Sequence, residues 1–477
     1  MSAESPQRMI PALVRHALYP LHEALLRRPT FRQVAALERT QWLSRGEIEA
    51  LQLERLAALL RTAAAHSPWH AQRMAEAAID PGADLTWEAF RRLPTMTRAD
   101  ARENRDRIAW LGVPGGASLY NTGGSSGQPL SFYFGRSRQA SDASGRIRAR
   151  RWWGVDVGAR EVYLWGAPVE LSKTDKTKQL RDRAFNQLLL NAFEMSPARM
   201  DAYLDAIERF EPECIYGYAS SVALLASHAA NRSRKPLLRR LRAVCTTGEP
   251  LYPYQRELIA EVFRVPVANE FGSRDIGFTA HETPAGQMLL LSEHLVLEAL
   301  DPQGRPVAAG EMGEAVLTAL CSEAQPFIRY RTGDMVRLGN EACREGRGLH
   351  VIGEVVGRST DFVVRADGTI MHALAVIYVL RAIEGIREFK IIQHELDRIE
   401  VLVVPDARWT PAGAAAIENG LRARLGIEVR IETRVVDGIA PEVSGKHRYV
   451  VSHVNVPAIR TLASAGTRPR ASAAPVN

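Results

Sequence analysis

A run of small and hydroxyl-bearing residues, "YNTGGSSGQPLSF" at Tyr120–Phe132, is the segment whose composition points most directly to chemistry. Glycines leave backbone N–H groups accessible and the hydroxyls add further donors, so the loop is suited to holding phosphate. The Gly-Lys-Ser/Thr ending of a P-loop is missing, which disfavours a P-loop kinase. Because Gly/Ser clusters are also common in turns and linkers, a plain surface turn remains an equal alternative at this point.

The elements around this loop predict an α/β protein. The runs "ASLYN" and "LSFYFG" predict two strands that make the loop hairpin-like. From Ser118 to about Leu320, short apolar runs alternate with helical stretches, which predicts largely parallel α/β layers with ligands at the strand ends. Residues 298–320 predict an antiparallel pair. The first hundred residues read as helical, with Ser44 and Glu47 in a capping-box pattern.

The chain restarts after Gly357 with a second set of elements. The segment "HALAVIYVLRAIEG" predicts a helix, and "REFKIIQHELDRIEVLVVP" predicts a pair of strands. Pro411 opens a further helix that runs to about Leu425, and "EVRIETRVVD" alternates as a half-buried strand. Together they predict a compact α+β domain. The tail 461–477 is small and polar, which predicts disorder.

Charge and composition narrow the classes of partner. The chain has 477 residues, with 61 Lys and Arg against 54 Asp and Glu, a net charge of +7. The excess is spread out, which suits an anionic small molecule or an acidic protein rather than nucleic acid. The densest basic run, "GRIRARRW", contains Arg146, Arg148, Arg150 and Arg151, and is interpreted as a solvated helix face.

The cysteines and the apolar segments suggest a cytoplasmic protein. The four cysteines form no C-x-x-C pair and are interpreted as reduced thiols. A zinc site that combines Cys245 or Cys321 with His281 or His294 has no support from spacing. No apolar run approaches the length of a membrane span, and the first twenty residues lack the features of an export signal.

The glycine-rich loop resembles the phosphate-binding signature of the adenylate-forming superfamily, which comprises acyl-CoA synthetases, nonribosomal adenylation domains and luciferases. Six later segments resemble further motifs of this family, in the family's order. The closest likeness is to the phenylacetate–CoA ligase branch, in its capsular-polysaccharide adenylyltransferase-like subgroup. The six segments are "TTGEPL" (Thr246–Leu251), "NEFGSRDIG" (Asn269–Gly277), "GEMGEAVLT" (Gly310–Thr318), "YRTGD" (Tyr330–Asp334), "GRSTDF" (Gly357–Phe362) and "SGKHR" (Ser444–Arg448).

The resemblance implies a role for each matched residue. One group of residues is implied to contact the phosphates and a second group the adenine, and the members of both are named below. Asp275 is implied to hold Mg²⁺. Asp334 would accept the ribose hydroxyls, Arg358 would add a second ribose or phosphate contact, and Lys446 would reach the α-phosphate and the carboxylate. Arg331 is left open between a structural role and one facing phosphate. The phosphate group is Thr122, Gly123, Gly124, Ser125, Ser126 and Gly127; the adenine group is Gly248, Glu249, Pro250, Phe271, Gly272 and Ser273; the acyl pocket is Tyr216, Gly217, Tyr218 and Ala219.

The same resemblance divides the chain into an adenylate-forming domain at 1–356, a hinge at 357–361 and a small mobile catalytic-lysine domain at 362–460. Two positions depart from the common pattern of the superfamily. The phosphate loop has Gln128 and Leu130 where many members have lysines, and Thr360 stands where the hinge usually has Asp or Lys. Thr360 lies at the predicted hinge, so this departure bears on the identity of the acyl acceptor more than on the formation of the adenylate.

The activity implied is ATP-dependent activation of a carboxylate to an acyl-adenylate, with release of pyrophosphate and transfer of the acyl group to coenzyme A. An amine or the phosphopantetheine of a carrier protein are alternative acceptors. A non-catalytic binding protein of the same fold is a further alternative, which the presence of Asp334, Arg358 and Lys446 disfavours. ATP, Mg²⁺ and coenzyme A are the expected cofactors and a small carboxylate the expected substrate, with no nucleic-acid or membrane partner. A homodimer is compatible with the resemblance.

Overall fold

The computed structural model describes residues 10–121, 130–166, 181–192, 195–232, 236–301, 303–357, 362–366, 370–439 and 450–454. These residues fall into two compact units, the first ending at 357 and the second starting at 362, and each is described by itself. The phosphate-loop residues 122–127, Arg358, Lys446 and the tail 461–477 lie outside the described residues. The hinge and the domain boundaries therefore stay predictions.

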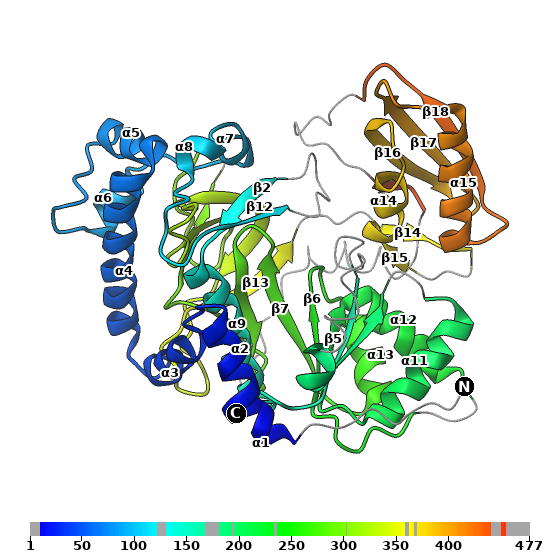
Figure 1. The fold of residues 1–477 in the computed structure, drawn as a ribbon, viewed down its shortest axis with the longest axis horizontal. Coiled ribbons are helices and arrows are strands. Elements are labelled where there is room, and N and C mark those ends of the chain that lie inside the picture. The colour runs from blue at the N-terminus through cyan, green and yellow to red at the C-terminus, as the bar shows by residue number, and fades with distance from the viewer. Residues whose placement is uncertain are drawn as a thin grey trace, which may run out of the picture. The chain divides into compact units, whose positions relative to one another are not determined.

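A large mixed sheet forms the centre of the first unit (Figure 1). Its strands are β3 (Glu161–Trp165), β4 (Gln187–Asn191), β5 (Cys214–Tyr218), β6 (Ala243–Thr247), β7 (Val267–Ser273), β8 (Gly277–Glu282), β9 (Met288–Leu290), β10 (Leu295–Leu300), β11 (Met312–Ala319), β12 (Tyr330–Leu338) and β13 (Val351–Gly357). Their order in the sheet is β10-β11-β12-β13-β9-β8-β7-β6-β5-β3-β4.

The sheet has a parallel half and an antiparallel half. Neighbours from β4 to β7 run parallel, and every pairing from β7 to β10 is antiparallel. The α/β class predicted from alternating strands and helices is confirmed, as is the antiparallel pair within 298–320. A separate short ribbon of β1 (Ser118–Asn121) and β2 (Ser131–Phe134) confirms the two strands expected on either side of the phosphate loop.

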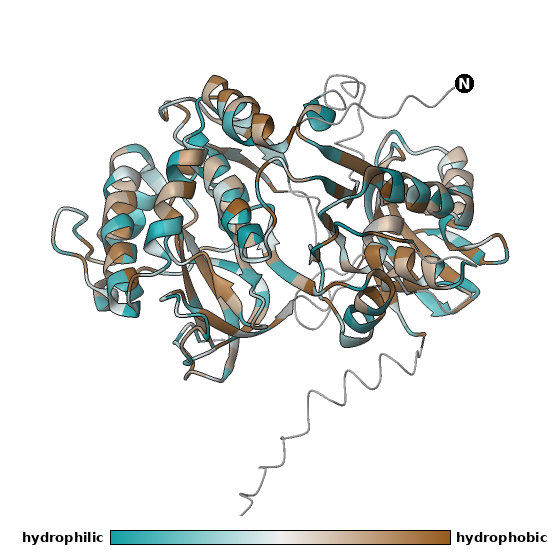
Figure 2. Cartoon of the chain, turned by 90° about the horizontal axis from the view of Figure 1, so that it is seen from below, coloured by the Kyte–Doolittle hydropathy of each residue, from teal (hydrophilic) through white to brown (hydrophobic). Residues whose placement is uncertain are grey.

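Helices pack on this sheet and around its edges. The bounds before the first strand are α1 (Pro11–Leu13), the π-helix η1 (Val14–Leu18), α2 (Tyr19–Leu25), α3 (Thr30–Thr40), α4 (Arg45–His66), α5 (Pro68–Glu76), α6 (Trp87–Arg91), α7 (Arg98–Glu103) and α8 (Arg105–Ile108). Within the sheet region they are α9 (Arg136–Trp152), α11 (Pro197–Phe210), α12 (Ala219–Ala230) and α13 (Pro253–Phe263). The predicted capping box of Ser44 and Glu47 begins α4. Most helices carry teal and brown residues together, as amphipathic elements do (Figure 2).

The cores follow the two halves of the sheet. On the parallel half, α11, α12 and α13 bury residues such as Leu204 and Leu225 against Val162 and Val244. On the antiparallel half, α4 buries Leu56 and Leu60 in a cluster that includes Ile328. Each fully buried leucine contributes roughly 2 kcal/mol from removal of its apolar surface from water. Within the described residues, no helix is both long and apolar enough to cross a membrane.

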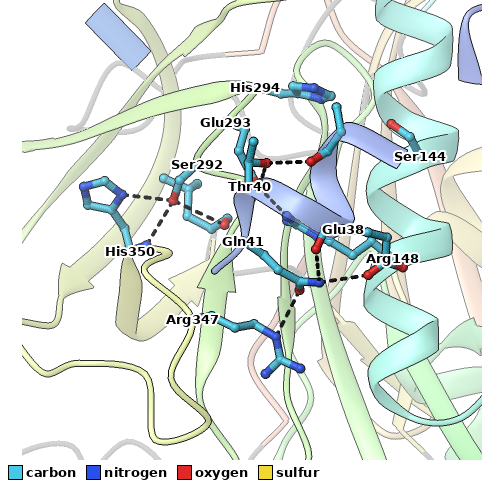
Figure 3. Close-up of polar contacts among 12 residues, drawn as sticks. Glu38, Thr40, Gln41, Ser144, Arg148, Ser292, Glu293, His294, Arg347 and His350 are labelled. Carbon is cyan, nitrogen blue, oxygen red and sulfur yellow. Dashed lines mark hydrogen bonds and ion pairs between the residues drawn. The ribbon is translucent and has the colours of Figure 1, made fainter. Parts of the chain in front are cut away.

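The interpretation of the arginine run as a solvated helix face is wrong. Helix α9 is buried between α3 and the sheet, and Arg148 and Arg150 are 1% and 5% exposed. Buried charge is tolerated because acidic partners lie opposite: Arg148 Nη1 lies 2.5 Å from Glu293 Oε1, which also accepts a hydrogen bond from Thr40 (Figure 3). The sequence pattern missed this because the carboxylates come from elements distant in sequence.

Further polar contacts join α3 to the region around this ion pair (Figure 3). The side chain of Gln41 donates to Glu38 at 2.8 Å and accepts from Arg347 at 3.1 Å. Nearby, the N–H of His350 donates to the hydroxyl of Ser292 at 3.0 Å. Helix α3, helix α9 and the segments around residues 292 and 347 are thereby tied together on one side of the first unit.

The second unit is a smaller α+β structure. Its strands are β14 (Phe362–Val364), β15 (Ile370–His372), β16 (Ile386–Glu395), β17 (Arg398–Pro405), β18 (Arg430–Val435) and β19 (Val450–Ser452), and its helices are α14 (Leu374–Arg381) and α15 (Pro411–Leu425). Four strands form a sheet in the order β18-β17-β16-β19, whose apolar side chains share one core with both helices. The predicted strand pair, the two predicted helices and the alternating strand are all confirmed.

Candidate active site

Three predicted segments meet at the carboxyl ends of neighbouring parallel strands. The register pairs Tyr218 of β5 with Thr247 of β6, and Thr247 with Glu270 of β7. The predicted acyl-pocket segment 216–219 ends β5, the adenine segment 248–250 follows β6, and Phe271 lies in the last part of β7. Parallel α/β sheets bind ligands at this edge of the sheet. The structure therefore brings together residues that are far apart in sequence.

The adenine and acyl-pocket segments contact each other directly. Gly248 has a φ of +79°, and a Cβ atom there would lie 3.1 Å from Cε1 of Tyr218. The carboxylate of Glu249 accepts a hydrogen bond of 2.5 Å from the N–H of Ser220, in the first turn of α12. An acidic group at this end of a helix is stabilised by the helix dipole. Glu249 therefore holds the start of α12 beside the adenine segment.

Two tyrosines and a tryptophan form an aromatic group at the predicted acyl pocket. Trp165, at the end of β3, stacks on Tyr218 with 4.3 Å between ring centroids. The ring of Tyr216 lies 5.9 Å from Trp165 and points to the side of the sheet that α9 covers, because its neighbours there are Arg146 and Arg150. Gly217 leaves no room for a side chain, since a Cβ atom would lie 2.6 Å from the carbonyl oxygen of Leu164.

The segment after β7 is anchored to the "YRTGD" segment. Asp275 is 4% exposed, and its Oδ2 accepts a hydrogen bond of 2.8 Å from the hydroxyl of Tyr330. Nη1 of Arg98 lies 3.7 Å from the same oxygen. Phe271 is half-buried against the core. A Cβ atom at Gly272 would lie 2.5 Å from the carbonyl oxygen of Gly277, so this position of β7 requires glycine.

The rest of the "YRTGD" segment occupies the first part of β12. Asp334 is 8% exposed, and its N–H donates to the hydroxyl of Thr332 at 3.1 Å. Gly333 has a φ of +79°, a conformation that favours glycine. Arg331 pairs with Glu314 and donates to Thr95 at 3.1 Å. The role left open for Arg331 is therefore at least structural.

The two strands beside the phosphate loop connect it to the same region. Asn121 and Ser131 are paired, and the hydroxyl of Ser131 donates to Oδ1 of Asn121 at 2.7 Å. Nη1 of Arg274, the residue before Asp275, donates to the carbonyl oxygen of Asn121 at 3.2 Å. The base of the loop is thereby fixed beside the segment that follows β7.

A buried polar cluster behind this edge was missed at the sequence level. Oε1 of Glu270 accepts hydrogen bonds from Tyr216 at 2.7 Å and from Thr247 at 3.2 Å, and Arg146 lies 3.3 Å from the same carboxylate. Burial raises the pKa of Glu270, but Arg146, His281 and the hydrogen bond from Tyr216 together lower the pKa below its usual range. The one sequence feature that could have indicated Glu270 is its position directly before Phe271, a residue of the predicted adenine group.

The donors that a metal ion would need are sparse in the first unit. Within the described residues, no group of three or more His, Cys, Asp and Glu side chains could hold a metal, and the cysteines are buried free thiols. The zinc combination of cysteines with His281 or His294 therefore has no structural support. Mg²⁺ is commonly held by one or two carboxylates together with substrate phosphates, so Asp275 fits as a single protein ligand.

Comparisons with known proteins agree with this arrangement. Residues 363–453 match the family model described as the CapK C-terminal domain. Protein CapK of Staphylococcus aureus is 23% identical over 381 residues, covering 78% of this chain and 82% of that protein. A phenylacetate-coenzyme A ligase of Thermus thermophilus is 25% identical over 384 residues, covering 76% of this chain and 82% of that protein.

A solved structure shares the fold of most of the chain. The 2-hydroxyisobutyryl-CoA ligase in complex with 2-HIB-AMP and CoA aligns with a TM-score of 0.61 at 20% identity, covering 90% of this chain and 94% of that chain. The chain is therefore similar in sequence to CapK and the phenylacetate-coenzyme A ligases, and in fold to this acyl-CoA ligase, all of which agree with the adenylate-forming class. Its curated relatives include several phenylacetate-coenzyme A ligases, and its C-terminal unit is similar to that of CapK.

Proposed function

We propose that this protein is an ATP-dependent carboxylate ligase that forms an acyl-adenylate and transfers the acyl group to coenzyme A. The observation that carries the proposal is the meeting of the adenine, acyl-pocket and post-β7 segments at one edge of the sheet. The hydrogen bond from Tyr330 to Asp275 adds the "YRTGD" segment to them. The names of the relatives, phenylacetate-coenzyme A ligases among them, support the same chemistry.

In this proposal the first unit binds the nucleotide and the acid. The loop 122–127 would contact the β- and γ-phosphates, the segments 248–250 and 271–273 the adenine, and Asp334 the ribose hydroxyls. Asp275 would hold Mg²⁺, which when bound neutralises charge on the phosphates. Arg358 would add a contact to ribose or phosphate.

The first step forms one bond and breaks another. An oxygen of the substrate carboxylate attacks the α-phosphorus of ATP, and the bond to the bridging oxygen breaks, so that pyrophosphate leaves with the electron pair. Positioning and charge stabilisation supply most of the catalysis in such a transfer. The ammonium group of Lys446 would stabilise the negative charge that develops between the carboxylate and the α-phosphate. In the second step the thiolate of coenzyme A attacks the acyl carbon, and AMP leaves.

Pyrophosphate exchange with a panel of carboxylic acids, with and without Mg²⁺, tests the first step. Asp275→Asn should raise the Mg²⁺ concentration needed for half-maximal exchange, because the variant loses the charge that would hold the ion. Asp301→Asn is the matched control, since Asp301 is half-buried in a loop and pairs with Arg305. Absence of exchange with every acid would refute the proposal.

The acceptor is tested separately from the first step. The mass of the product formed with coenzyme A, compared with that formed with amines or with a phosphopantetheine-bearing carrier protein, identifies the group that takes the acyl chain. We expect the coenzyme A thioester. The buried free thiols are compatible with a reducing compartment such as the cytoplasm. A homodimer stays a prediction that analytical ultracentrifugation would check.

A further inference from the structure

A cavity of about 110 Å³ lies between α9 and β3 in the first unit. A cavity of roughly 150 Å³ can hold a benzene ring, so this one suits the end of a substrate rather than a whole aromatic acid. Apolar side chains including Val14, Ile147 and Phe185 form part of its wall. The remaining wall is polar and includes Arg146, Arg150 and Tyr163. The cavity therefore suits a group that has both an apolar body and a hydrogen-bonding end.

Arg146 lies deep in the fold and yet is accessible. Its guanidinium lies over the rings of Tyr216 and Phe278, at 5.6 and 5.9 Å, and its side chain is nevertheless 33% exposed. Arg146 is one of the residues that line the cavity. Its contacts with Glu270 are long, at 3.3 and 3.4 Å, and use Nε and Nη2. Within the described part of the chain, Nη1 donates no hydrogen bond.

Arg150 adds positive charge to the same wall. It is 5% exposed, it pairs with Glu161, and its Nη1 donates to the hydroxyl of Tyr163 at 3.0 Å. Its Nε and Nη2 are buried and have no hydrogen-bond partner among the described residues. Glu161 and Asp156 also line the cavity, so its wall carries charges of both signs. The two unpaired nitrogens of Arg150 add buried hydrogen-bond donors to this wall.

The cavity is adjacent to the predicted acyl pocket. The guanidinium groups of Arg146 and Arg150 lie 5.6 and 4.7 Å from the ring of Tyr216, which belongs to the acyl-pocket segment at the end of β5. Tyr163, which lines the cavity, has its ring 5.5 Å from the same tyrosine.

We propose that the substrate acid carries an oxygen acceptor at the end remote from its reacting carboxylate, and that Arg146 binds this acceptor in the cavity. The inference rests on the proposed ligase function and names its substrate class. Guanidinium groups bind carboxylates with two parallel hydrogen bonds and bind neutral oxygens less strongly. The acceptor is therefore a second carboxylate or a hydroxyl or carbonyl oxygen, which matched acids distinguish.

The test compares acids that differ only at their far end. Phenylacetate bearing a para-methyl, para-hydroxy or para-carboxy group forms one series, and hexanoate against adipate forms another. Pyrophosphate exchange gives kcat/KM, and calorimetry gives the affinity without turnover. We expect the oxygen-bearing acids to exceed their apolar counterparts at least ~10-fold in both measurements, because a site with buried donors rejects analogues that leave them unpaired.

Two variants connect this preference to Arg146. Arg146→Met should bring the oxygen-bearing and apolar acids to within about 3-fold of each other, since the donor is lost. Arg146→Lys keeps the charge without the planar fork, so it should retain part of the preference for the para-carboxy acid. Arg387→Met, an exposed arginine of the second unit, is the control and should leave the preference unchanged. Circular dichroism identifies any variant that fails to fold, and Arg146→Lys then decides alone.

The outcomes separate this inference from the proposed function. Exchange that is equal or faster with the apolar acids, or a preference that Arg146→Met and Arg146→Lys leave intact, overturns the inference while the ligase function stands. Binding that prefers oxygen-bearing acids without exchange supports the inference about the cavity and refutes the ligase function. Neither exchange nor binding with any acid refutes both.

Discussion

The hydroxyl of Tyr330 donates a hydrogen bond of 2.8 Å to Oδ2 of Asp275, and this bond joins two motifs that lie 55 residues apart. Both side chains are buried, so the bond is shielded from competing water. It fixes the orientation of the carboxylate that we propose to hold Mg²⁺. Strand β12, which carries the "YRTGD" motif, therefore supports the proposed metal position as well as the proposed ribose position.

Removal of this hydroxyl should be costly. Tyr330→Phe leaves the buried carboxylate of Asp275 without one donor, which should lower the free energy of unfolding by about 1.5–3 kcal/mol. The Mg²⁺ requirement of pyrophosphate exchange should rise as well. Urea denaturation and a Mg²⁺ titration measure the two effects. Tyr133→Phe is the control, because Tyr133 is half-buried and its hydroxyl makes no hydrogen bond within the described residues; equal losses in both variants would contradict the prediction.

Gly248 should tolerate no side chain. Gly248→Ala places a Cβ atom 3.1 Å from Tyr218 at a φ of +79°, so we expect a loss of stability of about 1–2 kcal/mol and a higher KM for ATP. Gly286→Ala is the control that separates backbone strain from the contact with Tyr218. Gly286 has a φ of +77°, and a Cβ atom there would have nothing within 4 Å. The KM for ATP, measured by exchange at saturating acid, should change in the first variant alone.

Lys446 lies outside the described residues and is tested by kinetics. Lys446→Ala should slow adenylate formation by about 10²–10³-fold, as expected for loss of one group that stabilises transition-state charge. Lys390→Ala, on β16 of the same unit, is the matched control. Single-turnover formation of the adenylate measures the effect, and an unchanged rate would contradict the assigned role.

Acid should destabilise the first unit through His70. Arg73 donates to its Nδ1 at 2.9 Å and its Nε2 donates to the carbonyl oxygen of Pro326 at 3.0 Å, so the ring is satisfied in the neutral form. Burial and then Arg73 lower the pKa of His70 to about 3. Between the ordinary pKa of about 6.5 and this value, the unfolded chain binds a proton that the folded chain does not. The free energy of unfolding therefore decreases as the pH is lowered, by up to about 1.4 kcal/mol per pH unit.

The variant His70→Gln isolates this contribution. Its amide can accept from Arg73 and donate to Pro326 without titrating, so the dependence of the unfolding free energy on pH should become less steep between about pH 6.5 and 4. Urea unfolding at several pH values measures the slope. A slope equal to that of the parent protein would show that His70 does not control it.

The buried ion pair of Arg148 and Glu293 should depend on both partners. Arg148→Met leaves a carboxylate that is 0% exposed without its countercharge, at a cost of about 3–5 kcal/mol. The double variant Arg148→Met with Glu293→Gln should recover most of this loss, since Thr40 can still donate to the amide oxygen. Denaturant unfolding of the single and double variants measures the coupling, and additive losses would contradict it.

The comparison of sequence with structure separates local patterns from long-range pairing. The helix at Pro411–Leu425, the capping box of Ser44 and Glu47 and the strands around the phosphate loop were predictable, because each depends on neighbouring residues. The burial of Arg148 and Arg150 was not, because their partners Glu293 and Glu161 lie in other elements. The alternation of apolar and polar residues and the count of charges each describe one segment, so neither shows which distant residue pairs with a buried arginine.

The candidate site shows the same division. The family resemblance located the segments at 216–219, 248–250 and 271–275, and the structure brings them to one sheet edge. Glu270 and the cavity beside Arg146 were not predicted, because a buried carboxylate is recognised only through the side chains that surround it. The loop 122–127, Arg358 and Lys446 stay predictions.

The contact between Glu249 and Ser220 bears on any attempt to engineer a new acid specificity. Glu249 belongs to the predicted adenine segment and also anchors helix α12, which follows the predicted acyl-pocket segment, so we expect substitutions there to alter the binding of both ligands. On the opposite side, Arg146 of α9 pairs with Glu270 and so is linked to the predicted nucleotide segments as well, whereas no contact described above joins Ile147 to them. Redesign of the accepted acid should therefore begin at Ile147 and Tyr163, where the shape of the cavity can change while the nucleotide position is left alone.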